Sequence, residues 1–406
     1  MIASIPELAG SLKGQVILPD SDAYDDTRRV FIGDVDRRPT AIVRAANPSD
    51  VARVIEFAAR SGVELAVRCG GHSAAGYCTT DSGVVLDLRD LREIDIDVAA
   101  QTVWAGGGLS ALDLTNATGG DCLAVGFGDT GSVSIGGITL GGGIGFQVRK
   151  HGLTVDSMLA AEVVTADRHL HQVDAEREQE LFWALRGGGG NFGVVTKFKY
   201  SMHDVSRVFG GLVVLPGTPE VIEGFIAAAE AAPEELSAIA NIMPAPPMPF
   251  LPEHLHGKLV VFGFLVYLGD PSAGARAAAP FRALAIPLAD MLKPMAYPEI
   301  YPPEDPGYRP KPVQHTMFLE RVDEPAARTI VDYLNASDAM LRAAQLRVLG
   351  GAMARVPVGA TAFAHRQSRI CAVLVNFYDG TPEDRAHRQA WVDDFARAMY
   401  QGDDGA

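Results

Sequence analysis

The chain has 406 residues, of which 48% are hydrophobic and 21% charged, a composition typical of a folded globular protein and unlike a disordered or collagen-like chain. Its 50 acidic and 35 basic residues give a formal net charge of −15, which disfavours nucleic acid as a partner because a phosphate-binding surface needs clustered positive charge. No signal peptide, membrane span or zinc-ligand spacing is evident and the four cysteines form no C-x-x-C pair, so we expect a cytoplasmic protein with reduced thiols, no metal and no membrane contact.

Short strands and helices alternate in the first half of the chain. A strand predicted at residues 40–46 is followed by a helix that begins after the Asn47 cap and ends before Gly62. Further strands are predicted at residues 64–68 and 83–88. A β-α-β unit of this kind implies parallel strands joined by a right-handed crossover.

The pattern changes at about Ser206, where the glycine clusters end. Residues 210–215 and 258–267 predict longer strands, and residues 218–232 and 324–344 predict helices. These elements indicate a second domain of α+β type, with a sheet and covering helices.

Two proline-rich stretches, at residues 243–252 and 293–312, interrupt this second region. We interpret them as surface loops or as lids over a substrate entrance.

Glycine is in excess, with 43 residues in 406. The average share of glycine in proteins is about 7%. Much of the excess lies in clusters at residues 106–108, 136–145 and 187–193. Clustered glycines in an apolar sequence indicate backbone that bends sharply or approaches a ligand closely.

Two of the glycine-rich segments are candidate sites. In Val67-Arg-Cys-Gly-Gly-His-Ser73 a strand opens into a loop whose successive N–H groups can hold a pyrophosphate, with Arg68 adding charge. A histidine in such a loop is by itself more often an ordinary loop residue than a functional one. The segment 132–145 combines six glycines with three hydroxyls, and its backbone can lie flat against a planar ring; a tight glycine turn is the alternative.

A third segment contains Gly188, Gly190 and Gly193 at G-x-G-x-x-G spacing. A nicotinamide-binding fingerprint must follow a strand and open a helix, whereas here a predicted helix precedes the glycines and a strand follows them. A dinucleotide would therefore be held in another way.

Taken in order, these segments resemble the berberine bridge enzyme-like flavin oxidases, bacterial type, of the vanillyl-alcohol oxidase/p-cresol methylhydroxylase superfamily. The match covers about residues 20–205 and resumes at 350–356 and 360–366. The motifs that carry it are Arg-x-Gly-Gly-His-Ser at 68–73, Leu-Gly-Gly-Gly-Ile-Gly-Phe at 140–146, Lys-His-Gly-Leu-Thr-Val-Asp at 150–156 and Phe-Trp-Ala-Leu-Arg-Gly-Gly-Gly-Gly-Asn-Phe-Gly-Val-Val-Thr at 182–196.

The resemblance implies an α+β fold with the active site between two domains. Residues 1–205, with a core at 38–205, would form a p-cresol methylhydroxylase-type FAD-binding domain of two α/β subdomains. Residues 206–385 would form a substrate-binding domain with an antiparallel sheet covered by helices. Residues 386–406 would begin a return to the first domain, and we interpret the chain as truncated at Ala406, a naturally short protein being the alternative.

The resemblance also implies that His72 carries FAD covalently through the flavin 8α-methyl group. The link would be single, because Thr130 stands where doubly linked members have a cysteine, and Cys69 stands where the family usually has glycine. The loop at 68–76 would hold the pyrophosphate, the segment at 132–145 the ribityl chain and ring, and residues 193–195 the adenine end. The expected FAD-binding residues are Arg68, Cys69, Gly70, Gly71, His72, Ser73, Gly76, Thr130, Gly131, Ser132, Ser134, Gly136, Gly137, Thr139, Gly142, Gly143, Gly145, Gly193, Val194 and Val195.

The catalytic base has no single candidate, because the family's terminal tyrosine-containing segment is not in this sequence. The candidates in the second half are His365, Tyr378 and Tyr400, with His315 a lesser one. A histidine in the run Ala-Phe-Ala-His-Arg is equally well a structural residue.

We therefore expect an FAD-dependent oxidoreductase, an oxidase that takes a hydride from a small organic substrate (an alcohol, sugar or secondary metabolite) and reduces O2 to H2O2. The alternatives are a flavin dehydrogenase with another electron acceptor and a non-catalytic flavin- or ligand-binding protein. A nicotinamide dehydrogenase is the least favoured alternative.

Overall fold

A four-stranded sheet opens the structure, a computed structural model that describes residues 4–402. The strand order is β1-β2-β4-β3, with β1 antiparallel to β2, and with β2 and β3 both parallel to β4. The predicted β-α-β unit is present, but β4 lies between its two strands. The elements are α1 (Ile5–Ser11), β1 (Gln15–Ile17), α2 (Tyr24–Arg28), β2 (Ala41–Arg44), α3 (Pro48–Ser61), β3 (Leu65–Arg68) and β4 (Val84–Asp87).

Local sequence explains the helix α3 of this unit. The Asn47 side chain accepts a hydrogen bond from the Asp50 N–H, and Pro48 occupies the first turn. Gly62 ends the helix in the left-handed conformation, with φ of 65°. The start and end of α3 are therefore those predicted from the sequence.

A second, antiparallel sheet of five strands follows, in the order β5-β6-β10-β8-β9. A small pair, β11 and β7, lies beside it. The elements are β5 (Ile94–Asp97), β6 (Thr102–Gly106), α4 (Ala111–Gly119), β7 (Leu123–Ala124), α5 (Ile135–Leu140), α6 (Val148–His151), η1 (Thr154–Asp156), β8 (Met158–Val164), β9 (Leu170–Asp174), α7 (Gln179–Leu185), η2 (Gly189–Asn191), β10 (Val194–Ser201) and β11 (His203–Asp204).

The third and largest sheet is antiparallel and has eight strands. Its order is β15-β12-β14-β13-β18-β19-β17, and β16 also pairs with β12. The elements are β12 (Val208–Pro216), α8 (Pro219–Ala231), β13 (Leu236–Pro244), η3 (Glu253–Leu255), β14 (Leu259–Leu268), α9 (Pro271–Arg282), β15 (Ala289–Asp290), β16 (Lys293–Met295), η4 (Tyr297–Ile300), β17 (Pro312–Leu319), α10 (Glu324–Ala336), β18 (Arg342–Val348), α11 (Ala352–Arg355), η5 (Val358–Ala360), β19 (Ile370–Phe377) and α12 (Pro382–Met399).

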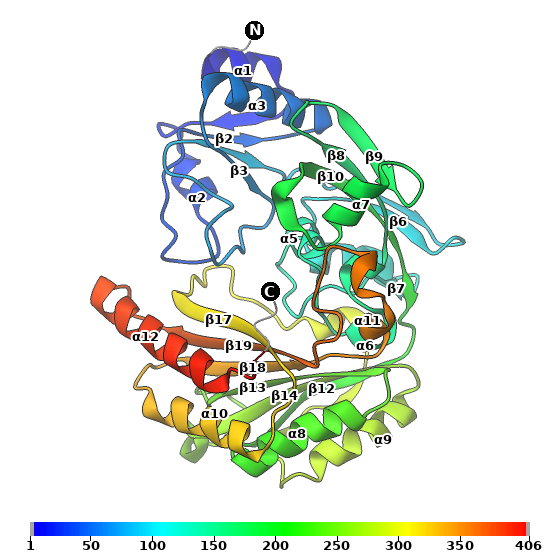
Figure 1. Cartoon of the computed structure of the whole chain (residues 1–406), viewed down its shortest axis with the longest axis vertical. Helices are drawn as coiled ribbons and strands as arrows, with labels where there is room; N and C mark the ends of the chain where they lie inside the picture. The colour runs from blue at the N-terminus through cyan, green and yellow to red at the C-terminus, as the bar shows by residue number, and fades with distance from the viewer. Residues whose placement is uncertain (1–3, 403–406) are drawn as a thin grey trace.

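The two faces of the large sheet have different partners (Figure 1). Helices α8, α9 and α10 cover the lower face, and the N-terminal part of the molecule lies above the other. Strand β13 shows the alternation: Ala238 and Ala240 belong to the core under the helices, whereas Ile239 belongs to the core that includes Tyr200 of β10. The large sheet thus holds the two parts together through its upper face.

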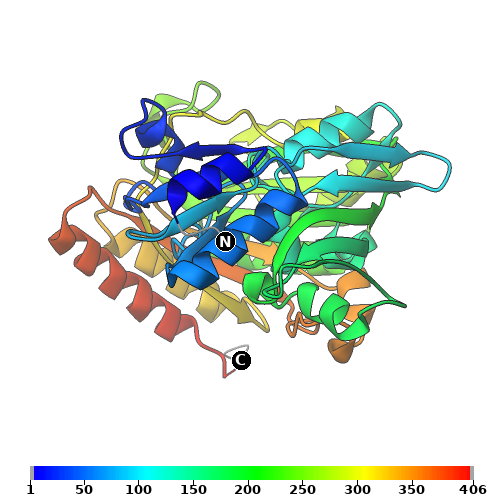
Figure 2. The ribbon, with the colours of Figure 1, turned by 90° about the horizontal axis from the view of Figure 1, so that it is seen from above.

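The long helix predicted at residues 324–344 is wrong in its last part. The helix ends at Ala336, and Arg342–Val348 is strand β18, paired on both sides in the middle of the sheet. Residues 382–399, which overlap the return segment predicted at 386–406, form α12, which packs on β17 and β19 along one side of the molecule (Figures 1 and 2). Residues 403–406, and with them the predicted truncation at Ala406, lie outside the described residues.

None of the helices within residues 4–402 is long and apolar enough to cross a lipid bilayer. In the same range, no group of three or more His, Cys, Asp or Glu side chains could hold a metal ion.

Candidate functional site

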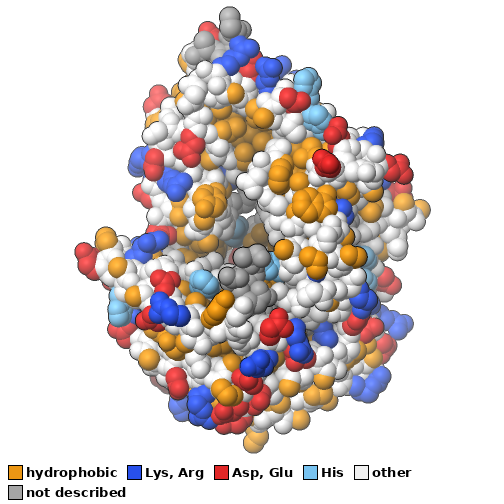
Figure 3. All heavy atoms as spheres, in the orientation of Figure 1, with side chains coloured by type: hydrophobic (Ala, Val, Ile, Leu, Met, Phe, Trp, Pro, Cys, Tyr) orange, Lys and Arg blue, Asp and Glu red, His pale blue; other side chains and the backbone are white. Residues whose placement is uncertain are grey.

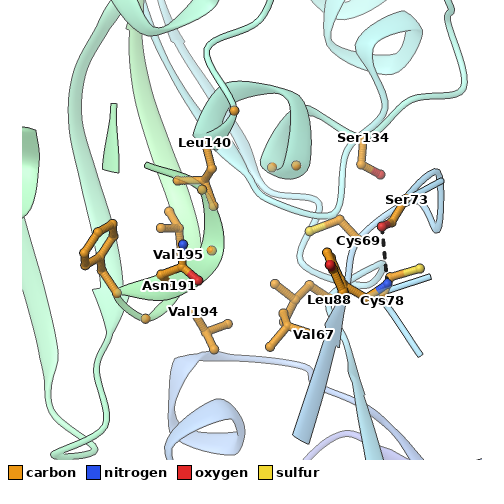
Figure 4. A pocket seen from close by; sticks show the side chains of 18 of the residues that line it. Val67, Cys69, Ser73, Cys78, Leu88, Ser134, Leu140, Asn191, Val194 and Val195 are labelled. Atoms are coloured by element: carbon orange, nitrogen blue, oxygen red, sulfur yellow. Dashed lines mark hydrogen bonds between the residues drawn. The ribbon is translucent and has the colours of Figure 1, made fainter. Parts of the chain in front are cut away.

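A cavity of about 1060 Å³ lies between the loop after β3, helix α5 and the glycine-rich loop before β10. In Figure 4, Cys69, Ser73 and Ser134 lie on one side of it, and Leu140, Asn191, Val194 and Val195 lie on the other. The surface view shows a hollow at the level where the N-terminal part meets the large sheet (Figure 3). The cavity is at the upper end of the size range of small-molecule sites, large enough for an extended dinucleotide.

Eleven of the twenty predicted FAD-binding residues line this cavity. They come from three separate segments of the sequence, which the fold brings together. They are Cys69, Gly70, Gly71, His72, Ser73, Ser134, Gly136, Gly137, Gly193, Val194 and Val195.

Backbone rather than side chain forms the surface at the centre of the cavity. Gly71 has φ of 76°, which favours glycine, and it follows Gly70 at the tightest point of the loop. A Cβ on Gly70 would lie 2.7 Å from Ser134 Oγ, so glycine is required for the loop to approach α5. Gly137, in contrast, is exposed and a Cβ there would meet no described atom within 4 Å. Its open backbone provides the space that a ligand needs.

Arg68 does not present its charge to the cavity, contrary to the prediction. Its side chain is buried, and its Nε and Nη2 both donate to Asp87 Oδ2, at 3.0 and 2.5 Å. A buried guanidinium requires a partner of this kind, and Asp87 lies beside it on the neighbouring strand. Within residues 4–402 no Lys or Arg lines the large cavity. A bound pyrophosphate would be held by backbone N–H groups and hydroxyls.

One end of the cavity is apolar. Leu65 and Val67 reach it from β3, where they alternate with the buried Ala66 and Arg68, and Val164 and Val194 face them. Val67 is 37% exposed, on β3 at the edge of the four-stranded sheet. A planar aromatic base fits such a surface.

The loop at 69–73 and helix α5 form a glycine cradle, and Cys69 lies at its back. Its Sγ would be 2.8 Å from a Cβ placed on Gly136, so the thiol is packed against α5. Burial, and after it the charge of Asp87, raises the pKa of the Cys69 thiol to about 12. The thiol is therefore neutral at physiological pH.

His72 also lines the cavity. Its ring stacks on Phe31, with ring centroids 4.4 Å apart and an interplanar angle of 22°. Burial lowers the pKa of His72, and the nearby Glu304 only partly opposes this effect. The imidazole is therefore uncharged at neutral pH, so one of its nitrogens carries a free electron pair.

Several of the other predicted residues have structural roles. A Cβ on Gly145 would lie 1.3 Å from the Phe127 carbonyl oxygen, and Cβ atoms on Gly142 and Gly143 would collide with Phe363 and Thr154. The Thr139 hydroxyl is buried and shares a 2.7 Å hydrogen bond with Tyr200.

Gly76, Gly131 and Ser132 also lie off the large cavity. Gly76 (φ of 72°) packs by Val35, and Gly131 packs by Leu112, Tyr301 and Glu304. Ser132 Oγ lies 3.2 Å from His72 Nε2.

A second cavity of about 320 Å³ adjoins the first, and Val133, Gly137, Ile138 and Gly141 line both. Besides Gly137, two further predicted residues, Thr130 and Gly143, line the second cavity. Its walls also include side chains from the second half of the chain, Arg347 and Phe363.

An ion pair crosses this second cavity. Arg347 Nη2 donates to Asp129 Oδ2 at 2.9 Å, and Gln345 Nε2 lies 3.4 Å from the same oxygen. Burial opposes the charge on Arg347, but Asp129 outweighs it, so that the pKa of Arg347 is raised. The hydrogen bond between them fixes the positions of both side chains.

The predicted catalytic candidates line neither cavity. His365 stacks on Phe318 at 4.2 Å and meets the edge of Phe363, which separates it from the second cavity. The Tyr378 hydroxyl donates to Asp34 Oδ2 at 2.5 Å, and burial together with Asp34 raises its pKa to about 12. Tyr400 ends α12 and is 51% exposed. His315 is exposed on β17.

Sequence reasoning missed Asp129, Arg347 and Glu304. Asp129 and Arg347 are 218 positions apart, and Glu304 is 172 positions from Ser132, to which it bonds. A local motif gives no signal for such pairs. The apolar residues Leu65 and Val67, however, could have been found from their period-2 alternation with Ala66 and Arg68.

Residues 39–174 match the family model of an FAD binding domain. The chain is 39% identical to the (R)-6-hydroxynicotine oxidase of Paenarthrobacter nicotinovorans over 197 residues, which are 48% of this chain and 43% of that enzyme. The alignment thus spans less than half the length of that relative.

The structure is also similar to solved structures over nearly its whole length. Physcomitrella patens BBE-like 1 has a TM-score of 0.88 at 21% identity, covering 98% of this chain and 88% of that one. The 6-hydroxy-D-nicotine oxidase of Arthrobacter nicotinovorans has a TM-score of 0.83 at 25% identity, covering 96% and 86%.

The cavity fits the cofactor that the family model names. Its size, the open backbone at Gly137, the positive-φ turn at Gly71 and the apolar surface around Val67 suit an extended dinucleotide of this kind. Residues 39–174 are therefore an FAD-binding domain, and the chain is similar to the 6-hydroxynicotine oxidases and has the fold of the berberine bridge enzyme-like and 6-hydroxynicotine oxidase structures.

Proposed function

We propose that the protein is an FAD-dependent oxidase. It removes a hydride from a small organic substrate (an alcohol, sugar or secondary metabolite) and passes the electrons to O2, with formation of H2O2. The observation that carries this proposal is the junction of the two cavities: a glycine-lined cavity that fits FAD opens across Gly137 and Ile138 into a smaller cavity with charged side chains. The related 6-hydroxynicotine oxidase supports oxidation of a small molecule.

The glycine cradle positions the cofactor by shape. FAD supplies the two-electron acceptor, and the chain's own contribution is orientation and electrostatics. The loop at 69–73 and helix α5 bind through the backbone, since no Lys or Arg among the described residues lines the large cavity. The apolar surface at Leu65 and Val67 excludes water from the base at the far end.

The second cavity holds the substrate. Asp129 offers a carboxylate that accepts a hydrogen bond from a substrate hydroxyl or amine and takes its proton as the hydride leaves. Arg347 fixes the carboxylate through its 2.9 Å hydrogen bond and balances its charge. Phe363 forms an apolar wall of the same cavity. This arrangement selects small substrates with one polar, protonated group.

His72 joins the cofactor to the chain in this proposal. The uncharged imidazole lies at the end of the cradle, where its electron pair is available to form a bond to the flavin 8α-carbon. The link is single, because Thr130 stands where a cysteine would form a second bond to the flavin. Thr130 lines the second cavity.

Anaerobic reduction of the bound flavin tests the catalytic part of the proposal. A panel of alcohols, sugars, cyclic amines and phenols is added without oxygen, and the flavin absorbance is followed. We expect at least one substrate to bleach the flavin and air to restore its colour with formation of H2O2. Bleaching that persists in air and is reversed by an artificial acceptor identifies a dehydrogenase. A flavin that no compound reduces identifies a non-catalytic binding protein.

A further inference from the structure

The segment between β16 and β17 is anchored to the FAD-binding part of the molecule. Tyr297 and Tyr301 are buried in the core that contains Tyr200 of β10. Further along, the Gly33 N–H donates to the Pro310 carbonyl at 2.7 Å. These anchors hold the intervening residues, among them Glu304, beside the loop that precedes α5.

Glu304 holds Ser132 through two hydrogen bonds. The Ser132 N–H donates to Oε1 at 2.9 Å, and the Ser132 hydroxyl donates to Oε2 at 2.5 Å. Both oxygens of the carboxylate are thereby directed to one residue. Two bonds to one charged group fix the direction of the hydroxyl far better than one would.

The direction of the Ser132 hydroxyl determines the tautomer of His72. The hydroxyl has a single proton, which it gives to Glu304, so it can only accept at its 3.2 Å contact with His72 Nε2. Nε2 must therefore carry the ring proton, and the free electron pair is on Nδ1. The stack on Phe31 fixes the plane of the ring.

A second residue of the same segment supports this arrangement from the opposite side. Tyr308 meets the edge of Phe31, with ring centroids 6.3 Å apart. Glu304 thus contacts Ser132, and Tyr308 contacts Phe31. Ser132 and Phe31 are the two side chains that hold His72.

We propose that Glu304, acting through Ser132, is a positioning residue for the covalent attachment of FAD to His72. This inference rests on the proposed function. Glu304 lies on a segment of the second half of the chain, so attachment follows the docking of that half onto the FAD-binding domain. The cofactor is bound first and linked only when both halves are in place.

The attachment step balances in atoms and electrons. The Nδ1 electron pair forms a bond to the 8α-carbon, and that carbon loses one proton to water. The two electrons of the broken C–H bond pass to the flavin. Nε2 loses its proton through Ser132 to the Glu304 carboxylate. Dioxygen then accepts the two electrons and two protons, which gives H2O2 and restores the oxidised flavin.

The rate of attachment tests the inference separately from catalysis. Protein produced without flavin is mixed with FAD, and the flavin that stays with acid-precipitated protein is measured against time. Total bound FAD is measured in parallel on undenatured samples. The variants are Glu304→Gln, Ser132→Ala and Ser132→Thr. The control is Glu299→Gln on the same segment, whose carboxylate instead bonds the Ala296 N–H and Lys293.

We expect Glu304→Gln and Ser132→Ala to bind as much FAD as the unaltered protein. They should attach it at about one tenth of the original rate, the loss expected from one charge-assisted hydrogen bond. Ser132→Thr, which keeps the hydroxyl, and Glu299→Gln should attach FAD at the original rate. Attachment at the original rate in both Glu304→Gln and Ser132→Ala would overturn the inference. Absence of acid-stable flavin in the unaltered protein would instead overturn the covalent link of the proposed function.

Discussion

The two adjoining cavities are built in different ways. The large one is lined at its centre by the backbone of short glycine-rich segments, at residues such as Gly70, Gly71 and Gly137. The small one is lined by side chains such as Asp129 and Arg347, from opposite halves of the chain. A cofactor shared by a whole family needs a constant shape, which backbone provides. A substrate that differs between members is recognised by side chains that can be exchanged.

The glycine-rich segment at 132–145 contains a similar contrast within a few residues. Gly137 leaves open space for a ligand, whereas Gly145 presses against the Phe127 carbonyl. Glycine is needed at both positions, for binding at one and for packing at the other. Substitutions can separate the two roles.

Gly145→Ala should have the largest effect, on folding itself. The new Cβ would lie 1.3 Å from a backbone oxygen, so the backbone must move. We expect a loss of about 3 kcal/mol or more in the free energy of unfolding, beyond the usual range of overpacking. Urea denaturation of the cofactor-free protein measures it. The matched Gly137→Ala should change stability by less than about 1 kcal/mol; equal losses would show that the two glycines have the same role.

Gly137→Leu should affect binding and leave folding intact. The larger side chain projects into the cavity where the structure leaves open space. We expect the affinity for FAD to fall about 100-fold, equal to about 2.7 kcal/mol, with the melting temperature of the cofactor-free protein unchanged. Fluorescence titration with FAD measures the affinity. The control is Gly359→Leu, at an exposed glycine outside both cavities. Unchanged affinity of Gly137→Leu for FAD would refute the proposal that the cofactor lies against Gly137.

Asp129→Asn should act on the small cavity alone. The amide keeps the shape of the carboxylate but cannot take a proton, so we expect kcat/KM to fall about 100-fold, as for loss of a general base. The FAD content should not change. The control is Asp95→Asn, at an exposed position on β5. Unaltered turnover would assign proton removal to another group.

The smallest effect concerns the stacked histidines His151 and His203, away from both cavities. Burial, followed by His203 and Lys150, lowers the pKa of His151 to about 3 from the ordinary 6.5. The unfolded chain then binds a proton below pH 6.5 that the folded chain does not, so stability falls as the pH falls from 6.5 towards 3. Between pH 6.5 and 5 the loss should be about 1–2 kcal/mol. His151→Gln should reduce this slope, and an unchanged slope would contradict the assignment.

The cradle could be predicted from the sequence because its parts are local. Cys69–Ser73 is one short loop and Ser134–Gly137 is the start of helix α5, and glycine spacing marks both. Sequence could not tell which way a side chain in or beside these segments points. Arg68 turns to Asp87 and Thr139 turns to Tyr200, because both face the interior once the neighbouring strands are in place.

The remaining features of the fold and the site depend on contacts between residues that are far apart in the sequence. Residues 339–344 are rich in helix-forming alanine, but Arg342–Val348 is a strand because β13 and β19 flank it; the alternating burial of Ala344, Leu346 and Val348 was the available signal. Asp129 meets Arg347 only because β18 occupies that place in the sheet. Glu304 reaches Ser132 only because its segment is anchored on the other half of the molecule.

The most direct test of the account is to locate the flavin on the chain by mass spectrometry. Trypsin releases residues 69–89 as one peptide, since the nearest basic residues are Arg68 and Arg89. We predict that this peptide, after acid denaturation and digestion, carries the mass of FAD on His72, and that the peptide from His72→Ala does not. Complete release of flavin by acid from the unaltered protein, or flavin on a peptide without His72, would contradict the account.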